Sequence, residues 1–331
     1  MRKHPFTIGL IVALLSIAVY LGVYYRTFFG IFGSHGEKTV ALIMKSSNVQ
    51  LDFWQAVNNG AAAAAKEMGA ELDALGPLTE NDAESQMRIL EETIARKPDA
   101  IVISPYNDER LDNLLAKARS AGIRLVVIDS LFRLDPSPVV VTNDYVEAGK
   151  LAGESAVAQT KGHPIVAVMS DEPESAASSE RLKGLKKALE SYKDSWYGVY
   201  YAQQSEERAY SMAKQLLEEG RPLNTFVAMD EPTTLGIAKL LQERRLEGVV
   251  RLIGFDSSAS EVGLLESGTL DAAIVQKPFN MGYLGVKTAL NLIDGKKVPQ
   301  ATYIESNVIT MNNMYTAENQ KLLFPFIGSN R

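Results

Sequence analysis

Six short apolar runs, each ending on small polar or acidic residues, constrain the fold of this chain more than any other feature. The runs are 40–44, 100–103, 125–128, 165–169, 226–228 and 252–255. Uninterrupted apolar segments of this kind are typical of strands that are buried on both faces, as in a parallel sheet. Helical patterns separate the runs, so the repeating unit is strand–helix–strand and the expected fold class is α/β.

Polar side chains follow these runs at the points where the strands end. Asp129 and Asp256 each come directly after a run, and Asp230 follows the run 226–228 after one intervening residue. Ligands of open α/β sheets bind outside the carboxyl ends of the strands. The sequence therefore predicts a polar crevice that is lined with carboxylates.

The composition excludes several kinds of site. The 331 residues carry a formal net charge of -6 and no cysteine, which argues against a nucleic-acid partner and excludes zinc thiolates and thiol nucleophiles. His163 precedes Pro164 in a turn-like segment, so a serine–histidine–aspartate triad is not expected. No glycine-rich phosphate loop follows the first strand, and we expect no cofactor and no metal ion.

The amino terminus predicts a membrane anchor. Two basic residues precede an uncharged stretch over 5–25, roughly the 20 residues that cross a bilayer. A cleaved signal peptide is the alternative, but its apolar core usually has only about 7–15 residues. We therefore expect a single-pass transmembrane helix over 1–29 and a stalk over 30–37, which place the body on the extracellular or periplasmic side of the cell membrane.

Helical periodicity fills the segments between the strands. It predicts helices that end at these glycines: Gly69, Gly122, Gly220, Gly268 and Gly295. Two further strands are expected at 272–275 and 302–306.

Seven short motifs follow one another in an order that identifies a family. They are Phe53-Trp54, Val127–Asp129, Thr142–Asp144, Arg181–Gly184, Asp230–Gly236, Gly254–Asp256 and Ala273–Gln276. In this order and spacing, from about residue 38 to 315, the chain resembles the periplasmic sugar-binding proteins of the ribose-binding type, which are related to lactose-repressor effector domains.

The resemblance implies two doubly wound parallel-sheet lobes that are joined by a three-strand hinge and clamp a ligand between them. The implied first lobe comprises 38–143 plus 277–306, and the second comprises 144–276 plus 307–331. Closure of such a hinge is a change of shape that a second protein can recognise.

The two strand-end aspartates are the first candidate ligand contacts. A helix N-cap is the alternative role for both Asp129 and Asp256. Loop sequence follows Asp129, and Ser258 could cap the helix after Asp256 unaided, so we favour ligand contact. A carboxylate that accepts sugar hydroxyls forms charge-assisted hydrogen bonds of about 1.5–3 kcal/mol each.

Motif position adds Arg181, Asp230 and Gln276 to the implied contacts. A guanidinium can hold adjacent hydroxyls bidentately, and an amide can both donate to and accept from a hydroxyl. For Gln276 an exposed strand terminus is an equal alternative. Of Phe53 and Trp54, we expect one to stack on a sugar ring and the other to pack in the core.

Lys45, Asp52 and Asn143 are further candidates. Asp52 also suits an N-cap, and two residues are inserted after Lys45 relative to the family. The chain departs from the ribose-binding pattern where Ser130 replaces an arginine and Met229 replaces an asparagine. These departures favour another monosaccharide or a small polyol over ribose.

Three classes of function compete. The favoured one is a membrane-tethered sugar receptor whose partner is a sensor histidine kinase or an ABC sugar permease, and the short stalk favours the sensor because it confines the body near the membrane. A transcription regulator needs a DNA-binding motif where this chain has an apolar run. A glycoside-processing enzyme would use paired carboxylates, but these carboxylates match binding positions, so we expect no enzyme activity.

Overall fold

The structure is a computed structural model. It describes residues 16–21, 23–24, 37–48, 52–79, 82–106, 108–130, 136–173, 176–192, 194–220 and 222–324. The chain divides into two units, Met1–Lys38 and Thr39–Arg331. Most of the expected anchor and stalk lies outside the described residues, and residues 16–21 and 23–24 are helical and exposed. None of the described helices is both long and apolar enough to span a membrane.

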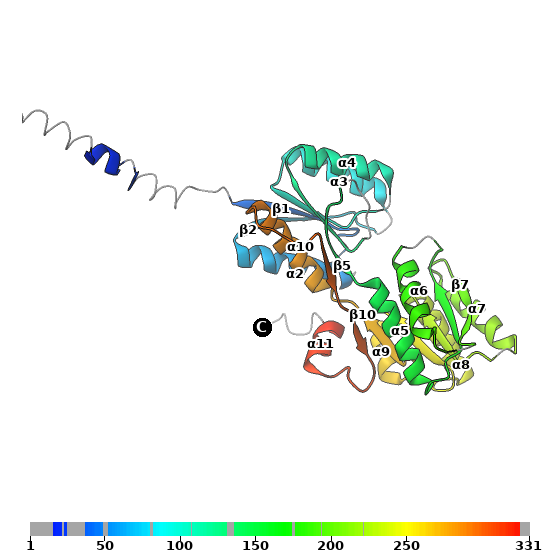
Figure 1. The fold of residues 1–331 in the computed structure, drawn as a ribbon. Helices are drawn as coiled ribbons and strands as arrows, with labels where there is room; N and C mark the ends of the chain where they lie inside the picture. Colours follow the sequence, from blue (N-terminus) through cyan, green and yellow to red (C-terminus); the bar gives the residue numbers. More distant parts are fainter. Residues whose placement is uncertain are drawn as a thin grey trace, which may run out of the picture. The chain divides into compact units, whose positions relative to one another are not determined.

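Two six-stranded sheets form the body (Figure 1). The first has the order β11-β5-β4-β3-β1-β2, and the second has the order β12-β10-β9-β8-β6-β7. The first sheet contains β1 (Lys38–Ile43), β2 (Ala70–Leu75), β3 (Ala100–Ile103), β4 (Arg124–Ile128), β5 (Val139–Asn143) and β11 (Ala301–Ile304). The second contains β6 (Val166–Ser170), β7 (Trp196–Tyr201), β8 (Thr225–Ala228), β9 (Arg251–Phe255), β10 (Ala272–Val275) and β12 (Asn307–Ile309).

Most neighbouring strands run parallel. The pairs from β11 to β1 in the first sheet are parallel, as are those from β10 to β7 in the second. The edge strand β12 is antiparallel to β10. Two α/β lobes with parallel sheets confirm the fold class that the apolar runs predict.

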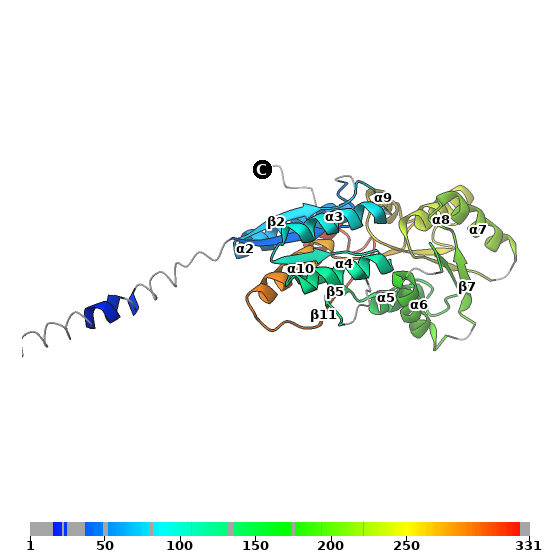
Figure 2. The same cartoon turned by 90° about the horizontal axis from the view of Figure 1, so that it is seen from above.

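Helices cover both faces of each sheet (Figures 1 and 2). Around the first sheet they are α2 (Asp52–Met68), α3 (Ala83–Arg96), α4 (Glu109–Ser120) and α10 (Pro278–Ile293). Around the second they are α5 (Tyr145–Gln159), α6 (Ala176–Leu189), α7 (Glu206–Glu218), α8 (Glu231–Arg244), α9 (Ala259–Ser267) and α11 (Ala317–Leu323).

Strand β3 shows why the central strands are apolar at every position. All four of its residues are buried. Val102 packs in a core with residues of α2 and α10, whereas Ile101 and Ile103 pack in a second core with residues of α3 and α4. Since successive side chains of a strand point to opposite faces, a sheet that is covered on both faces needs apolar residues throughout.

The chain passes from one sheet to the other three times. It crosses after β5, returns after β10, and crosses again between β11 and β12. Asn143 ends the first crossing strand, and Gln276 follows the second. The crossings therefore place two of the expected site residues between the sheets.

Sequence analysis missed β2, β5, β7, β12 and α11, and it expected a strand at 302–306 where β11 spans Ala301–Ile304. Of the missed strands, β2, β7 and β12 lie at the edges of the sheets. An edge strand has a neighbouring strand on one side only, so its residues are less covered and need not all be apolar. In β2, half-buried and exposed residues alternate over most of the strand. In the interior strand β5, the sequence analysis singles out only the motif Thr142–Asp144 at its end.

Glycine lets α5 and α6 approach closely. A Cβ atom on Gly149 of α5 would lie 1.7 Å from the carbonyl oxygen of Arg181 in α6, and one on Gly184 would lie 1.8 Å from that of Val146. These two contacts set the position of the helix that carries Arg181.

We predict that Gly149→Ala lowers the free energy of unfolding by about 1–3 kcal/mol, because the added methyl group overpacks the helix interface. Gly263→Ala in α9 is the matched control, since nothing lies within 4 Å of its Cβ position; it should stabilise the chain by up to about 1 kcal/mol. Urea unfolding curves measure both changes. Equal stability of the two variants would contradict the helix contact.

Candidate functional site

A cleft with a volume of about 770 Å³ lies where strands of both sheets end. Six of the residues expected from sequence line it: Lys45, Phe53, Trp54, Asp129, Asp256 and Gln276. Arg181, Asp230 and Asn143 are not among the described residues of its lining. The side chain of Asp52, at the start of α2, lies outside the described part of the chain.

Asp129 accepts hydrogen bonds from three different segments. Its Oδ2 accepts from Lys45 Nζ at 3.1 Å and from Ser104 Oγ at 3.2 Å. Its Oδ1 lies 3.2 Å from the Tyr145 hydroxyl. Lys45 and Ser104 stand just past the ends of β1 and β3, so the carboxyl ends of three neighbouring strands meet at this carboxylate.

Lys45 places a positive charge beside Asp129, where the ribose-binding pattern has an arginine at the next position and this chain has Ser130. Ser130 replaces the arginine of the ribose-binding pattern, and its hydroxyl donates to the Pro105 carbonyl oxygen at 2.9 Å. The ammonium of Lys45 instead pairs with Asp129 in the cleft and lies 6.0 Å from the centre of the Tyr106 ring. The negative charge of Asp129, which follows β4, is therefore balanced by Lys45, which follows β1.

The two aromatic residues at the start of α2 both line the cleft but differ in how much of each ring is exposed. Trp54 is 3% exposed and belongs to the core between the first sheet and α10. Phe53 is half-buried and meets Trp54 edge to face, with the ring centres 4.9 Å apart. Phe53 is thus the ring with more surface left for a ligand.

A second hydrogen-bonded group joins the hinge to the second sheet. Asn143 Nδ2 donates to Gln276 Oε1 at 2.5 Å, and Gln276 Nε2 donates to Asp256 Oδ1 at 2.9 Å. Burial raises the pKa of Asp256, and the positive charge of Arg181 opposes this shift. Gln276 thus holds the Asp256 carboxylate by a hydrogen bond, and the charge of Arg181 partly offsets the cost of its burial.

Arg181 is buried behind this group. Its guanidinium lies 4.2 Å from the centre of the Phe255 ring and donates from Nη1 to the Met229 carbonyl oxygen at 2.8 Å. Its Nε is buried and has no hydrogen-bond partner among the described residues. Met229, which replaces an asparagine, therefore contributes its main chain to holding Arg181.

Tyr145 is a residue that the sequence analysis missed. Its hydroxyl lies 2.5 Å from the Asp129 carbonyl oxygen, and its ring lies 5.6 Å from the Arg181 guanidinium. Burial raises its pKa, so it remains a neutral phenol. Because Tyr145 opens α5 just after the first crossing, it connects Asp129 to Arg181. Its place directly after Asp144 at the crossover was the only signal in the sequence.

Asp230 caps a helix, a role that the sequence analysis did not weigh for it. Its Oδ1 accepts from the Thr233 amide of α8 at 3.0 Å. Its Oδ2 is buried and has no partner among the described residues. Burial raises its pKa to about 6, and Asp171 and Asp256 add to the shift.

Ser258 caps the start of α9, so Asp256 is not needed as the cap of this helix, as the sequence suggests. Ser258 and Glu261 form a reciprocal capping box at the start of α9. Burial raises the pKa of Glu261 to about 9, and the nearby Asp256 adds to this effect. Glu261 is thus a protonated carboxyl group near the cleft at neutral pH.

Among the described residues, no group of three or more potential ligands is arranged to hold a metal ion. The site instead consists of carboxylates, amides, cations and aromatic rings that face one cleft. These groups suit the binding of a small molecule that is rich in hydroxyl groups.

Comparison with known proteins identifies the family to which this two-lobed chain belongs. The family model "Periplasmic binding protein domain" matches residues 40–297. The chain therefore belongs to the periplasmic binding protein family, as its motifs predict. It is a binding protein and not an enzyme, which confirms that expectation.

Curated and solved relatives agree with this membership. The chain is 27% identical to the D-ribose/D-allose-binding protein of Pseudomonas aeruginosa, over 78% of this chain and 82% of that protein. It is similar to GanP, a glucose-galactose binding protein from Geobacillus stearothermophilus, with a TM-score of 0.75, 27% identity, and coverage of 85% and 100%. A solute binding protein from Agrobacterium radiobacter in complex with D-arabinose also has a TM-score of 0.75 and 27% identity, with coverage of 88% and 100%.

We predict that Glu261→Gln removes part of the pH dependence of stability. A carboxyl group whose pKa rises on folding, here from 4.5 to about 9, stabilises the folded chain fully below pH 4.5, and this contribution is lost as the pH rises towards 9. Glutamine keeps the capping box without ionising. The variant should be more stable than wild type near pH 9 by about 1–3 kcal/mol.

Thermal melting across this pH range measures the effect. Glu206→Gln is the matched control, because Glu206 is an exposed acid in the first turn of α7. If Glu261→Gln and wild type lose stability in parallel as the pH rises, Glu261 is ionised in the folded chain and the prediction is wrong.

Proposed function

We propose that this protein binds a monosaccharide or a small polyol between its two lobes and presents it to a membrane partner. One observation carries the proposal. Two strand-end carboxylates, Asp129 and Asp256, one from each sheet, line a single cleft, and each is held by donors from neighbouring segments.

The balance of charge supports a neutral ligand. The acidic residues among the described lining are Asp129, Glu231 and Asp256, and the basic ones are Lys45, Lys277 and Lys321. Asp129 is paired with Lys45, and Asp256 interacts with Arg181. The three acidic and three basic residues of the described lining carry no net formal charge that would call for a counter-charge on the ligand. Sugars and polyols are neutral and hydroxyl-rich, and they match such a site.

Unpaired polar atoms support the assignment of the individual contacts. Asn143 Oδ1, Arg181 Nε and Asp230 Oδ2 are buried and have no partner within the described part of the chain. Buried polar groups in proteins are nearly always hydrogen-bonded. We assign these three residues to the ligand-binding set together with Phe53, Asp129, Asp256 and Gln276, and we add Lys45 from its position in the cleft. Trp54 and Asp52 support α2 in this scheme.

The lobe boundaries belong to the same proposal. We place 38–143 and 277–306 in the first lobe, and 144–276 and 307–331 in the second. The membership of the two sheets supports this division, because β1–β5 and β11 form one sheet and β6–β10 and β12 form the other. The three crossings between them would act as the hinge of a clamp.

Relatives support a sugar as the ligand class. The relatives named above carry ribose, allose, glucose, galactose or arabinose in their names. Their identities to this chain of 27% leave room for another sugar. Ser130 and Met229, at family contact positions, point away from ribose itself.

The membrane partner is the finer part of the proposal. The uncharged stretch over 5–25 and the stalk over 30–37 support a membrane-anchored body on the outer side. A short tether raises the effective concentration of the body towards a partner in the same membrane. We propose a sensor histidine kinase as this partner, and an ABC sugar permease as the alternative.

We predict that Asp256→Asn weakens sugar binding at least about 100-fold, because a carboxylate in a charge-assisted hydrogen bond to a buried ligand contributes about 1.5–3 kcal/mol and its loss leaves Arg181 unbalanced. A thermal-shift screen of pentoses, hexoses and inositols first identifies the ligand. At a hundredfold excess over Kd the ligand should stabilise wild type by about 2.7 kcal/mol. Calorimetry then measures the affinity of the variant.

Asp194→Asn is the matched control. Asp194 and Asp256 both have positive φ angles, 60° and 79°, which asparagine adopts readily. Asp194 is exposed and does not line the cleft. Near-native affinity of Asp256→Asn would remove Asp256 from the site, and a screen without any ligand would remove the sugar from the proposal.

We predict that the body, cross-linked in membranes of the source cell with sugar present, is recovered with a receptor kinase, because the stalk confines both proteins to one surface. Mass spectrometry identifies the cross-linked protein. Recovery of a sugar permease alone would overturn the sensory role, and recovery of the body free in the medium would overturn the anchor.

A further inference from the structure

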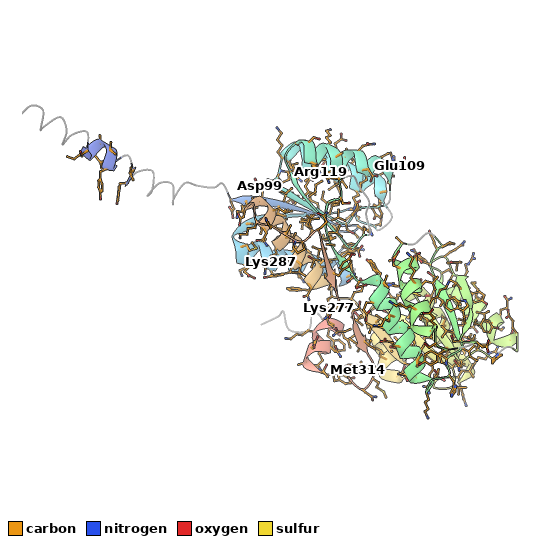
Figure 3. All side chains as sticks on the ribbon, viewed as in Figure 1. Asp99, Glu109, Arg119, Lys277, Lys287 and Met314 are labelled. Carbon is orange, nitrogen blue, oxygen red and sulfur yellow. The ribbon has the colours of Figure 1, made fainter. Side chains whose placement is uncertain are left out.

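The cleft extends well past the carboxylates. Beyond Gln276 its lining continues through Lys277, labelled in Figure 3, to Phe279 and Asn280 in the first turn of α10. On the side of the second sheet it reaches Lys321 and Leu322 of α11. This outer part of the cleft, defined by Phe279, Asn280, Lys321 and Leu322, contains none of the contact residues assigned above.

Phe279 is an exposed aromatic ring within a binding cleft. Its side chain is 46% exposed, in contrast to the buried apolar residues Met281 and Val286 farther along α10. What sets Phe279 apart from other exposed apolar side chains is its place in the lining of the cleft, where its ring is accessible to a ligand. In the same lining, the Asn280 amide and the Lys321 ammonium can hydrogen-bond to hydroxyl groups.

The backbone fixes the spacing between Phe279 and Phe53. A Cβ atom on Gly60 of α2 would lie 1.9 Å from the carbonyl oxygen of Phe279, so the start of α10 rests directly against Gly60. Phe53 precedes Gly60 on the same helix by seven residues, which corresponds to about two turns and roughly 10 Å along the axis. The lining therefore includes Phe53 and Trp54 at the start of α2 and Phe279 at the start of α10, whose backbone rests about two turns farther along α2.

The volume agrees with a ligand of more than one ring. The cleft of about 770 Å³ falls in the upper part of the range of about 300–1,000 Å³ that is typical of pockets for drug-sized ligands. Such ligands are larger than a single hexose.

We propose that Phe279 forms the platform of an outer subsite that takes the second ring of a β-linked disaccharide or glycoside. The first ring occupies the inner site between Asp129 and Asp256, so this inference rests on the proposed function. The ring of Phe279 stacks on the apolar C–H face of the second sugar, as aromatic side chains do with flat apolar partners.

Calorimetry on the full-length chain in detergent tests the proposal with six probes. They are D-xylose, D-glucose and D-galactose and the corresponding β-1,4-linked dimers, xylobiose, cellobiose and galactobiose. For a sugar that binds, the dimer should bind wild type up to about tenfold more tightly than the monosaccharide, which corresponds to the stacking of one further ring.

The Phe279→Ala variant should lose this preference while its affinity for the monosaccharide stays within about twofold of wild type. Phe279→Leu, which keeps an apolar side chain without a flat face, should lose most of it. Tyr303→Ala is the matched control, since Tyr303 is 62% exposed on the edge strand β11 and does not line the cleft.

The outcomes separate this inference from the proposed function. A dimer that binds no more tightly than its monosaccharide, or a Phe279→Ala variant that weakens both equally, overturns the outer subsite and leaves the inner sugar site intact. Asp256→Asn should weaken monosaccharide and dimer alike. A wild-type chain that binds none of the six probes overturns the subsite, whereas the sugar proposal itself is decided by the broader screen of pentoses, hexoses and inositols.

Discussion

The carboxylate of Asp129 is the interaction on which the site depends. It accepts hydrogen bonds from residues that follow β1 and β3 and lies within reach of the Tyr145 hydroxyl at the start of α5. A buried carboxylate is costly unless it is paired and hydrogen-bonded. The Lys45 ammonium meets this requirement and is itself held in the cleft. Through Tyr145 the same group reaches the first segment of the second lobe, so the inner site and the hinge share one hydrogen-bonded cluster.

The parallel sheets explain why such a cluster can form. Parallel strands all end at the same edge, and each strand end projects the next few residues towards the ligand side. The three crossings of the chain bring the ends of both sheets to one cleft. Close contact of α5 with α6 at Gly149 then positions Arg181, whose guanidinium stacks on Phe255 behind Asp256. The packing of the helices thus determines where the charged groups of the site lie.

The arrangement of charges in the cleft bears on the kind of ligand that it can bind. Each cleft aspartate is matched by a cation, Asp129 by Lys45 and Asp256 by Arg181. Charged groups that are already paired can still form hydrogen bonds with a neutral ligand. These hydrogen bonds orient the ligand, whereas they select little for its charge. Membership of the periplasmic binding protein family agrees with this chemistry. The half-buried ring of Phe53 adds apolar surface to the cleft, which suits the sugar proposed as its ligand.

The sequence by itself determined the interior strands except β5, the aspartates at their ends, the fold class and the family, because strands buried on both faces must be apolar throughout and strand ends must be polar. It did not determine the edge strands, such as β2, where one side faces solvent and the pattern weakens. Only the tertiary structure decided which groups meet: Lys45 and Asp129 are 84 residues apart, and Asn143 and Gln276 are 133 apart. Local patterns carry no information about such pairs, since the hydrogen bonds form only after the chain has crossed between the lobes. For the same reason Tyr145 and Phe279 became visible as parts of the cleft region only in the folded chain.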